Sequence, residues 1–312
     1  MQFTRWTDMR KRDVTLEEIE TVLLNKNEDR ECEKYKNWNI EKQSSISSNI
    51  FNGNEIKYNS YKISVDYFQP NIDINSEYIS KKVWLIVYEV NKKINYIIDR
   101  NSDARIIIRR LMSYTGKGEI EENNIEFKSD EFVWLISKVY NQDNFFEGSN
   151  DFLGNLYLNN IKGFKGGTED FLTKISTEGE SVMNIISTLS FLIESKNLNQ
   201  IDIDFDYKEH TRISVRLNSN KKVMTVDFNK YTGKLLKDSE NKRNIEILII
   251  LYTEIIPIIK QSYQNDIEAE LWNNDKFIEF IKEVRQALNG KIESRLNELS
   301  SSSVKLKEIE SC

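Results

Sequence analysis

Short runs of alternating apolar and polar residues, joined by turn-forming residues, constrain the fold of this chain more than any other feature. Residues 63–67 alternate in this way, which is the period of a strand with one buried face. The run 83–90 is dense in β-forming residues and is followed, after an Asn-Lys-Lys turn, by a second such run at 94–99. Residues 211–217 and 222–228 flank another short polar turn. Because strands joined by short turns are antiparallel, the sequence predicts mainly antiparallel sheets.

Helical segments lie before, between and after these predicted strands. A capping box at Thr15–Glu18 predicts that a helix begins there. The segment 103–114 carries an apolar stripe with helical spacing, formed by Ile107, Ile108, Leu111 and Met112. Two long helices, 240–263 and 266–288, are predicted near the end of the chain. Pro257 should kink the first of them, because its ring removes a helix hydrogen bond.

The length of 312 residues suggests about two domains at roughly 150 residues each. Residues 141–170 are irregular in pattern and rich in glycine, which predicts a domain junction there. The predicted fold is therefore α+β, with mainly antiparallel sheets, packed helices, two domains and two long C-terminal helices. Further strands are predicted at 119–127, 131–140 and 201–207, and a further helix at 180–194. The predicted divisions are an N-terminal helix with a polar linker at 1–54, an α+β domain at 55–145, a second α+β domain at 146–298, and a frayed tail at 299–312.

The composition excludes several kinds of site. A single histidine, His210, rules out a zinc site that needs two, and its place between Glu209 and Thr211 predicts a surface turn residue. The two cysteines, Cys32 and Cys312, lie near opposite ends of the chain and fit neither a disulfide framework nor a metal knuckle. We therefore predict no metal, no cofactor and no catalytic residue.

The chain offers no segment that targets it to a membrane. Its first residues lack the apolar core of a secretory signal. The most apolar run, 245–259, is interrupted by Glu246, Glu254 and Pro257, and it falls short of the roughly 20 apolar residues that a spanning helix needs. We therefore expect a cytoplasmic protein.

Charge is unevenly distributed along the chain. The formal net charge is −6, which as a bulk property argues against a nucleic-acid-binding protein. The segment 81–117, however, holds nine basic and three acidic side chains, and the segment 207–237 holds eight basic and two acidic ones. One strongly basic segment therefore falls in each predicted domain.

The arginines of the two basic segments are spaced to share single faces. On the predicted strand, Arg212, Ser214 and Arg216 lie on one face, because successive residues point to opposite sides. On the predicted helix, Arg105 and Arg109 lie about one turn apart. If the two faces meet, they form a basic groove with about six to eight phosphate contacts and strong salt dependence. The candidate nucleic-acid-binding residues are Arg105, Arg109, Arg110, Lys162, Lys165, Arg212, Arg216, Lys221 and Lys222.

Two other interpretations of the charged residues stay open. The arginines can instead pair with carboxylates of neighbouring elements, such as Asp99 and Asp103, on ordinary solvated faces. A metal-dependent nuclease of the restriction type needs a carboxylate cluster and a lysine, and Asp206 and Lys208 at the end of a predicted strand have that form. Upstream acids that could complete such a cluster are Glu178, Glu180, Asp202 and Asp204.

Two further patterns have a structural and a functional interpretation each. The glycine-rich segment 163–168 could cradle a phosphate with its backbone amides, although it lacks the spacing of a P-loop, or it could be a hinge. Aromatic residues on the predicted strands could stack on bases, although core packing is the commoner role of such residues. These residues are Trp84, Tyr88, Tyr96, Trp134 and Tyr140.

The order of elements between about residues 80 and 260 is also informative. It runs from the paired strands of 82–99 through the helix 103–114 to Ile125–Phe127 and Phe132–Trp134, and the strands of 201–217 follow later. This order resembles that of phage-exclusion and anti-phage defence proteins of the Rex A and Kiwa B types. The resemblance implies a two-domain α+β protein that binds DNA, dimerises and acts with a membrane partner. It involves no diagnostic motif, so it implies no catalytic residue.

These observations lead to one leading hypothesis and two alternatives. The leading hypothesis is a non-enzymatic, sequence-independent nucleic-acid-binding protein of anti-phage defence, which binds DNA rather than RNA and forms a homodimer. One alternative is a restriction-type, metal-dependent nuclease. The other is a protein-interaction component of a multi-subunit complex, whose apolar C-terminal helices dock a partner.

Overall fold

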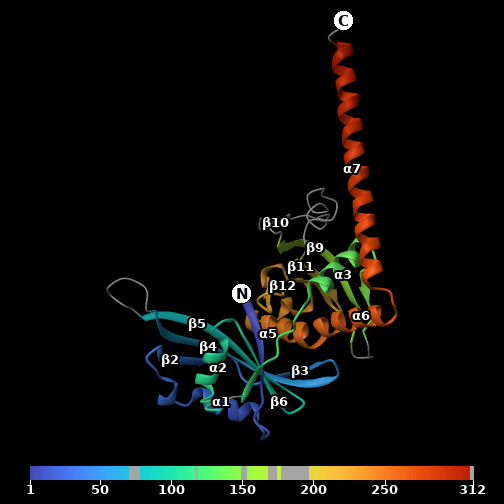
Figure 1. Cartoon of the computed structure of the whole chain (residues 1–312). Helices are drawn as coiled ribbons and strands as arrows, with labels where there is room; N and C mark the ends of the chain where they lie inside the picture. The colour runs from blue at the N-terminus through green and yellow to red at the C-terminus, as the bar shows by residue number, and fades with distance from the viewer. Residues whose placement is uncertain (70–77, 117, 149–152, 168–173, 177–196, 310–312) are drawn as a thin grey trace.

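An antiparallel sheet organises the molecule (Figure 1). The computed structural model describes residues 1–69, 78–116, 118–148, 153–167, 174–176 and 197–309. The strands are β1 (Gln2–Asp8), β2 (Tyr35–Lys42), β3 (Ser47–Phe51), β4 (Asn54–Phe68), β5 (Tyr78–Val90), β6 (Lys93–Ile98), β7 (Ile120–Glu122), β8 (Phe145–Phe146), β9 (Leu156–Gly167), β10 (Lys174–Ser176), β11 (Asn197–Tyr207), β12 (His210–Asn218) and β13 (Val223–Val226). The helices are α1 (Leu16–Leu24), α2 (Ala104–Leu111), α3 (Ser129–Tyr140), α5 (Glu240–Ile250), α6 (Ile256–Glu268) and α7 (Asn274–Ile309), and the short helical turns are η1 (Glu28–Arg30), η3 (Phe228–Lys230), η4 (Lys234–Lys237) and η5 (Leu251–Ile255).

The first strand joins two halves of the sheet. The strand order is β10-β9-β11-β12-β13-β1-β6-β5-β4-β2, while β3, β7 and β8 pair with β4, β1 and β9. Gln2 and Phe3 of β1 pair with β13, and Thr4–Thr7 of the same strand pair with β6. We call β1–β7 the N-terminal half-sheet and β8–β13 the C-terminal half-sheet. The pairings between described strands are antiparallel throughout, which confirms the predicted α+β class with mainly antiparallel strands.

The first 54 residues differ from the predicted helix and polar linker. The helix α1 does begin at the predicted cap, where the Glu18 amide donates to the Thr15 hydroxyl at 3.3 Å. A strand, β1, precedes it, and two further strands, β2 and β3, occupy the segment predicted to be a linker. Most side chains of β2 and β3 are exposed or half-buried, and β2 ends the strand order. Such strands lack the apolar alternation by which sequence patterns identify a strand.

Two other predicted segments have a different structure. Residues 131–140, predicted as a strand, belong to the helix α3, whose capping-box Glu131 accepts a hydrogen bond from the Lys128 amide at 2.6 Å. The run is buried on nearly every side, and an apolar run without periodicity fits a buried helix as well as a strand. Residues 156–167 form the strand β9 rather than an irregular junction, although its register with β11 shifts at three points, and Phe164 is buried. The predicted helix 180–194 lies outside the described residues.

Two apolar cores form on opposite faces of the N-terminal half-sheet. Alternate residues of β5, such as Leu85, point to the core that α1 and α2 cover, and the predicted stripe of α2 is buried there. Intervening residues such as Ile86 point to a larger core. That core also holds the inner face of the C-terminal half-sheet, together with α3, α5, α6 and the start of α7. The larger core therefore spans both half-sheets, and the division into domains at 145/146 stays a prediction.

The C-terminal helices depart from the prediction at Pro257 and at the tail. Helix α5 passes into a π-helical turn, η5, before Pro257 enters the first turn of α6. Proline has no backbone N–H, so one helix hydrogen bond is missing at this point. The wider π-helical turn lets the chain continue as a helix despite that missing bond. Helix α7 extends away from the body of the molecule as far as Ile309, so the predicted tail is helical to that residue (Figure 1). Among the described helices, none combines the length and apolarity needed to cross a membrane.

Candidate nucleic-acid interface

A cleft of about 660 Å³ lies where the two half-sheets meet. Lys62 of β4 and Trp84 of β5 line it from the N-terminal half-sheet. The polar faces of β9, β11, β12 and β13 line it from the other half-sheet, and η3 and the start of α5 complete its wall. The cleft therefore draws side chains from segments more than 150 residues apart in the sequence.

Alternation along β11 and β12 produces the polar wall of the cleft. In the register of the two strands, Asp202 lies opposite Arg216 and Asp204 lies opposite Ser214. The intervening residues of both strands are buried in the larger core, as the predicted period of two requires. They are Ile201, Ile203, Phe205, Ile213, Val215 and Leu217.

A buried carboxylate gathers two of the predicted basic residues. Asp204 is 5 % exposed, and one of its oxygens lies 2.6 Å from the Lys162 ammonium and 2.9 Å from Nε of Arg212. Its other oxygen accepts a hydrogen bond from the Ser214 hydroxyl at 2.6 Å. The neighbouring Arg216 donates to both oxygens of Asp202, at 2.7 and 2.6 Å. The structure thus brings Lys162, Arg212 and Arg216 together on one surface.

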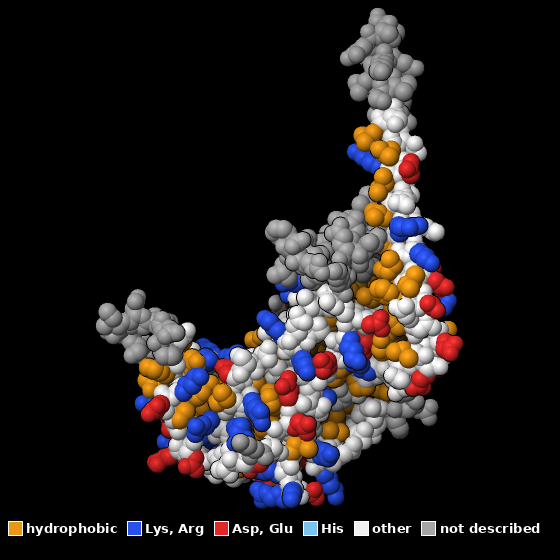
Figure 2. All heavy atoms as spheres, viewed as in Figure 1, with side chains coloured by type: hydrophobic (Ala, Val, Ile, Leu, Met, Phe, Trp, Pro, Cys, Tyr) orange, Lys and Arg blue, Asp and Glu red, His pale blue; other side chains and the backbone are white. Residues whose placement is uncertain are grey.

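The carboxylates compensate much of this positive charge. Among the described residues, the cleft is lined by four basic side chains (Lys62, Lys162, Arg216 and Lys230) and four acidic ones (Asp202, Asp204, Asp227 and Glu240). The side chains of Arg212 and Arg216 remain 42 % and 45 % exposed, so a guanidinium that binds a carboxylate on one edge still presents N–H groups to solvent on another. On the face of the molecule that Figure 2 draws, basic and acidic side chains are likewise interspersed.

The remaining predicted basic residues of this half lie apart from the cleft. Lys222, in the turn between β12 and β13, binds Glu126 at 3.1 Å, and Lys221 beside it is exposed. Lys165, further along β9, does not line the cleft.

The arginines of α2 lie on the other side of the N-terminal half-sheet. Ile107, Ile108 and Leu111 of α2 pack on the sheet face opposite to the one from which Trp84 points into the cleft. Arg105, Arg109 and Arg110 are therefore separated from Arg212 and Arg216 by the sheet itself. The single continuous groove expected from the two basic segments is not formed.

The α2 arginines also bind differently. Arg109 donates to the backbone carbonyls of Gly116 and Tyr114, at 2.5 and 3.2 Å, just beyond the end of its own helix. Arg110 donates to the Asp29 carbonyl at 3.2 Å, and the two arginines line a separate hollow of about 550 Å³. The predicted pairing of these arginines with Asp99 and Asp103 is wrong, because those carboxylates bind Arg100 and Lys81.

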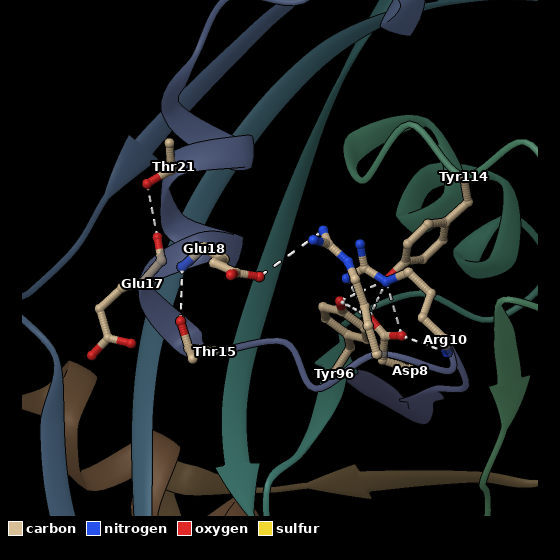
Figure 3. Close-up of polar contacts among 9 residues, drawn as sticks. Asp8, Arg10, Thr15, Glu17, Glu18, Thr21, Tyr96 and Tyr114 are labelled. Carbon is tan, nitrogen blue, oxygen red and sulfur yellow. Dashed lines mark hydrogen bonds and ion pairs between the residues drawn. The ribbon is translucent and has the colours of Figure 1, made fainter.

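A buried polar cluster stabilises this side of the molecule (Figure 3). The Asp8 carboxylate at the end of β1 accepts hydrogen bonds from the Tyr114 hydroxyl at 2.5 Å and from Nη2 of Arg10 at 2.6 Å. The Tyr96 hydroxyl lies 2.9 Å from that of Tyr114. Burial alone would raise the pKa of Asp8, but the hydrogen bonds from Arg10 and Tyr114 outweigh it and lower the pKa below 3.8.

The described residues of the nuclease hypothesis do not assemble into a metal site. The Lys208 ammonium lies 3.2 Å from both carboxylate oxygens of the buried Glu254 on η5, so it serves an internal ion pair. Within the described part of the chain, no group of three or more histidine, cysteine, aspartate or glutamate side chains is placed to hold a metal ion. Glu178 and Glu180 lie outside the described residues.

His210 and the glycine-rich segment also differ from their predictions. His210 is 1 % exposed at the start of β12, and its Nδ1 lies 2.7 Å from the Tyr231 hydroxyl, so it is not a surface turn residue. Residues 163–167 are part of β9, so they form neither a hinge nor a phosphate-binding loop, and Thr168 lies outside the described residues. Of the aromatic residues predicted on strands, Trp134 and Tyr140 lie on α3.

Sequence reasoning named Trp84 as a residue that could stack on bases, but it missed other residues of the cleft. Lys62 and Trp84 are cross-strand neighbours on β4 and β5, and the alternation around residue 63 already predicted that Lys62 faces away from the smaller core. Phe228 and Lys230 belong to η3, a turn without a periodic signal. No protein-family model matches this chain, and no curated protein matches it either. Its function therefore has to be argued from the geometry of the cleft.

Proposed function

We propose that this chain is a non-enzymatic, sequence-independent nucleic-acid-binding protein and that the cleft is its binding site. The observation that carries the proposal is the meeting of Lys162, Arg212 and Arg216 on one partly exposed surface, with Lys62 on the opposite wall. Guanidinium and ammonium groups of this kind bind phosphate oxygens, which fix the strand without reading its sequence. With about four such contacts, the slope of log K against log salt should be about −3 to −4.

The biological setting belongs to the same proposal. The resemblance to phage-exclusion and anti-phage defence proteins supports a role in phage defence, a preference for DNA over RNA and a protein partner. A cytoplasmic location is proposed beside them. The division of the chain into domains at 145/146 is proposed as well, and the position of the cleft between the half-sheets supports it, because ligand sites favour domain interfaces.

A titration of a fluorescently labelled DNA oligonucleotide at several salt concentrations tests the proposal. The variant Arg212→Ala/Arg216→Ala should bind roughly ten-fold more weakly or worse, and its salt slope should be shallower by about 1.4–1.8. The matched control is Arg105→Ala/Arg110→Ala, which removes the same charge from the far side of the sheet and should bind like the parent. Two oligonucleotides of unrelated sequence should bind equally well. Salt-independent binding, or equal losses in the two double variants, would contradict the proposal.

A second candidate, self-association, is supported by α7. The apolar stripe that packs on α3 at Phe280 and Val284 continues along the projecting part of the helix. There Ile292, Leu296 and Leu299 are 40 %, 51 % and 52 % exposed. An isolated helix gains little stability of its own in water, so an exposed apolar stripe of this length favours a covered state.

We infer that a second copy of the same helix covers the stripe, because two such stripes can face each other along their whole length in an antiparallel pair. Light scattering after size exclusion should give a dimer for the parent and a monomer for Leu296→Glu. The control Leu271→Glu changes an exposed leucine outside α7 and should stay dimeric. A monomeric parent would exclude this candidate.

A further inference from the structure

Two aromatic rings lie in the cleft beside its charged wall. Trp84 and Phe228, both partly buried, line it with ring centroids 6.4 Å apart and planes at 76°. Phe3 supports both rings from the core, with centroids 6.0 Å from Trp84 and 5.9 Å from Phe228. A rigid apolar surface of this kind, bordered by polar groups, is typical of a site that holds a flat ligand group.

The indole of Trp84 also has an unused hydrogen-bond donor. Its Nε1 is buried and has no hydrogen-bond partner among the described residues. Two other described side-chain atoms share this condition, on Arg30 and Tyr61, but neither residue lines the cleft. A donor this deeply buried is closed to a ligand in the cleft as well as to solvent, so a ligand there would contact the rest of the Trp84 ring.

The size and charge of the cleft restrict what enters it. A volume of about 660 Å³ is within the range of pockets that hold single small molecules, so it takes a nucleotide-sized group and not a duplex. Its equal numbers of basic and acidic lining side chains do not favour an anion deep inside. The exposed edge of Arg216, with Arg212 beyond it on the same strand face, does favour an anion at the mouth of the cleft. A neutral base inside, with its phosphates at the rim, fits both conditions.

We propose that the cleft takes an unpaired base of a single-stranded nucleic acid, which stacks on Trp84 and meets the edge of the steeply inclined Phe228 ring, while its flanking phosphates contact Arg212, Arg216 and Lys62. This inference rests on the proposed function and adds a preference for single strands. In a duplex the faces of the bases are covered by their neighbours, so only an unpaired base can reach the rings.

The experiment compares oligo-dT with the same strand annealed to oligo-dA. The parent should bind the single strand at least ten-fold more tightly than the duplex. Trp84→Leu should weaken single-strand binding by about ten-fold, because it removes the ring on which the base stacks, and it should leave duplex binding unchanged. Trp84→Phe keeps an aromatic ring, so its loss should be smaller. The matched control is Trp38→Leu, which removes a tryptophan from β2, away from the cleft.

The possible outcomes separate this inference from the proposed function. In one outcome the parent binds single strand and duplex equally well, Trp84→Leu has the affinity of the parent, and Arg212→Ala/Arg216→Ala binds more weakly. This outcome overturns the proposal of an unpaired base but leaves the proposed phosphate contacts intact. Failure of the parent to bind either form overturns both proposals. If Trp84→Leu melts at a much lower temperature than the parent, Phe228→Leu on the partly buried turn η3 replaces it, and single-strand binding that is unaffected by Phe228→Leu counts against the inference.

Discussion

The arginines of β12 and those of α2 have similar spacing in the sequence but bind different groups, carboxylate side chains in β12 and backbone carbonyls in α2. Arg216 donates to a carboxylate side chain and is 45 % exposed, and Arg212 does the same at 42 %. Arg109 donates to backbone carbonyls that follow its helix. Carbonyls beyond a helix end lack helical partners, so an arginine there completes the fold. On a strand face the backbone is already paired, so an arginine there binds other side chains or a ligand.

The surroundings of the two regions reinforce this difference. Arg216 lines the cleft with its two aromatic rings, and Arg212 lies four residues away on the same face of β12. The arginines Arg109 and Arg110 of α2 line a hollow next to the Asp8 cluster, which consists of buried hydrogen bonds. Removing an arginine from α2 should therefore cost stability, and removing one from β12 should cost binding. The following predictions test this distinction from the largest expected effect to the smallest.

Acid should destabilise the β12 region through His210. Burial, followed by the nearby positive charge of Lys234, lowers the pKa of His210 from 6.5 to about 4. The folded protein therefore binds this proton less readily than the unfolded chain, and the stability that the neutral ring confers is lost as the pH falls from 6.5 to 4. By pH 4.5 this amounts to about 2–3 kcal/mol. Urea unfolding at pH 7, 5.5 and 4.5 measures the loss.

The variant His210→Gln provides the control for this measurement. It removes the titrating group, so its stability should change less between pH 6.5 and 4 than that of the parent. An identical pH dependence in the two proteins would show that another group is responsible.

On the opposite side of the sheet, Asp8→Asn should destabilise the protein by about 2 kcal/mol at neutral pH, because it leaves the Arg10 guanidinium without its carboxylate. Since the pKa of Asp8 is lowered, its contribution is complete above 3.8 and disappears as the pH falls further. The parent and the variant should therefore differ at pH 7 and converge in strong acid. DNA affinity should not change, and a loss of affinity would contradict the separation of the two regions.

Single substitutions of one arginine from each region should have opposite effects on stability and on DNA binding. Arg109→Ala should lower the free energy of unfolding by about 1–2 kcal/mol, because two carbonyls lose a charged donor. Arg216→Ala should lower it by less than about 1 kcal/mol, because the ion pair that it removes is largely exposed. DNA binding should show the reverse order. Chemical denaturation and DNA titration of the same two variants decide the matter.

Local pattern predicted the strands that carry the site. The alternation of β11 and β12 correctly placed Arg212, Ser214 and Arg216 on one face, and the stripe of α2 correctly predicted which side chains are buried. These predictions succeed because the period of two or of 3.6 residues decides which side chains meet the core. The strands β2 and β3 escaped prediction because little of their side-chain surface is buried.

The relation between distant segments could not be predicted from the sequence. Whether Arg109 and Arg216 share a surface depends on which face of the sheet α2 covers, and both choices satisfy the same apolar stripe. The pairing of Asp204 with Lys162 depends on β9 lying beside β11, although the two residues are 42 positions apart in the sequence. The cleft arises where β1 joins the half-sheets, a junction set by the pairing of Phe3 with Met224.

The smallest predicted effect concerns the carboxylates that hold the β12 arginines. Asp202 is 24 % exposed and competes with phosphate for Arg216, so Asp202→Asn should raise DNA affinity by about two- to five-fold, within the range of single exposed ion pairs. The same change should alter stability by no more than about 0.5 kcal/mol. The control Asp103→Asn frees Lys81 on the α2 side and should leave DNA affinity unchanged. If both variants raise the affinity equally, general electrostatic attraction explains the binding, and the distinction between the two arginine faces loses its meaning.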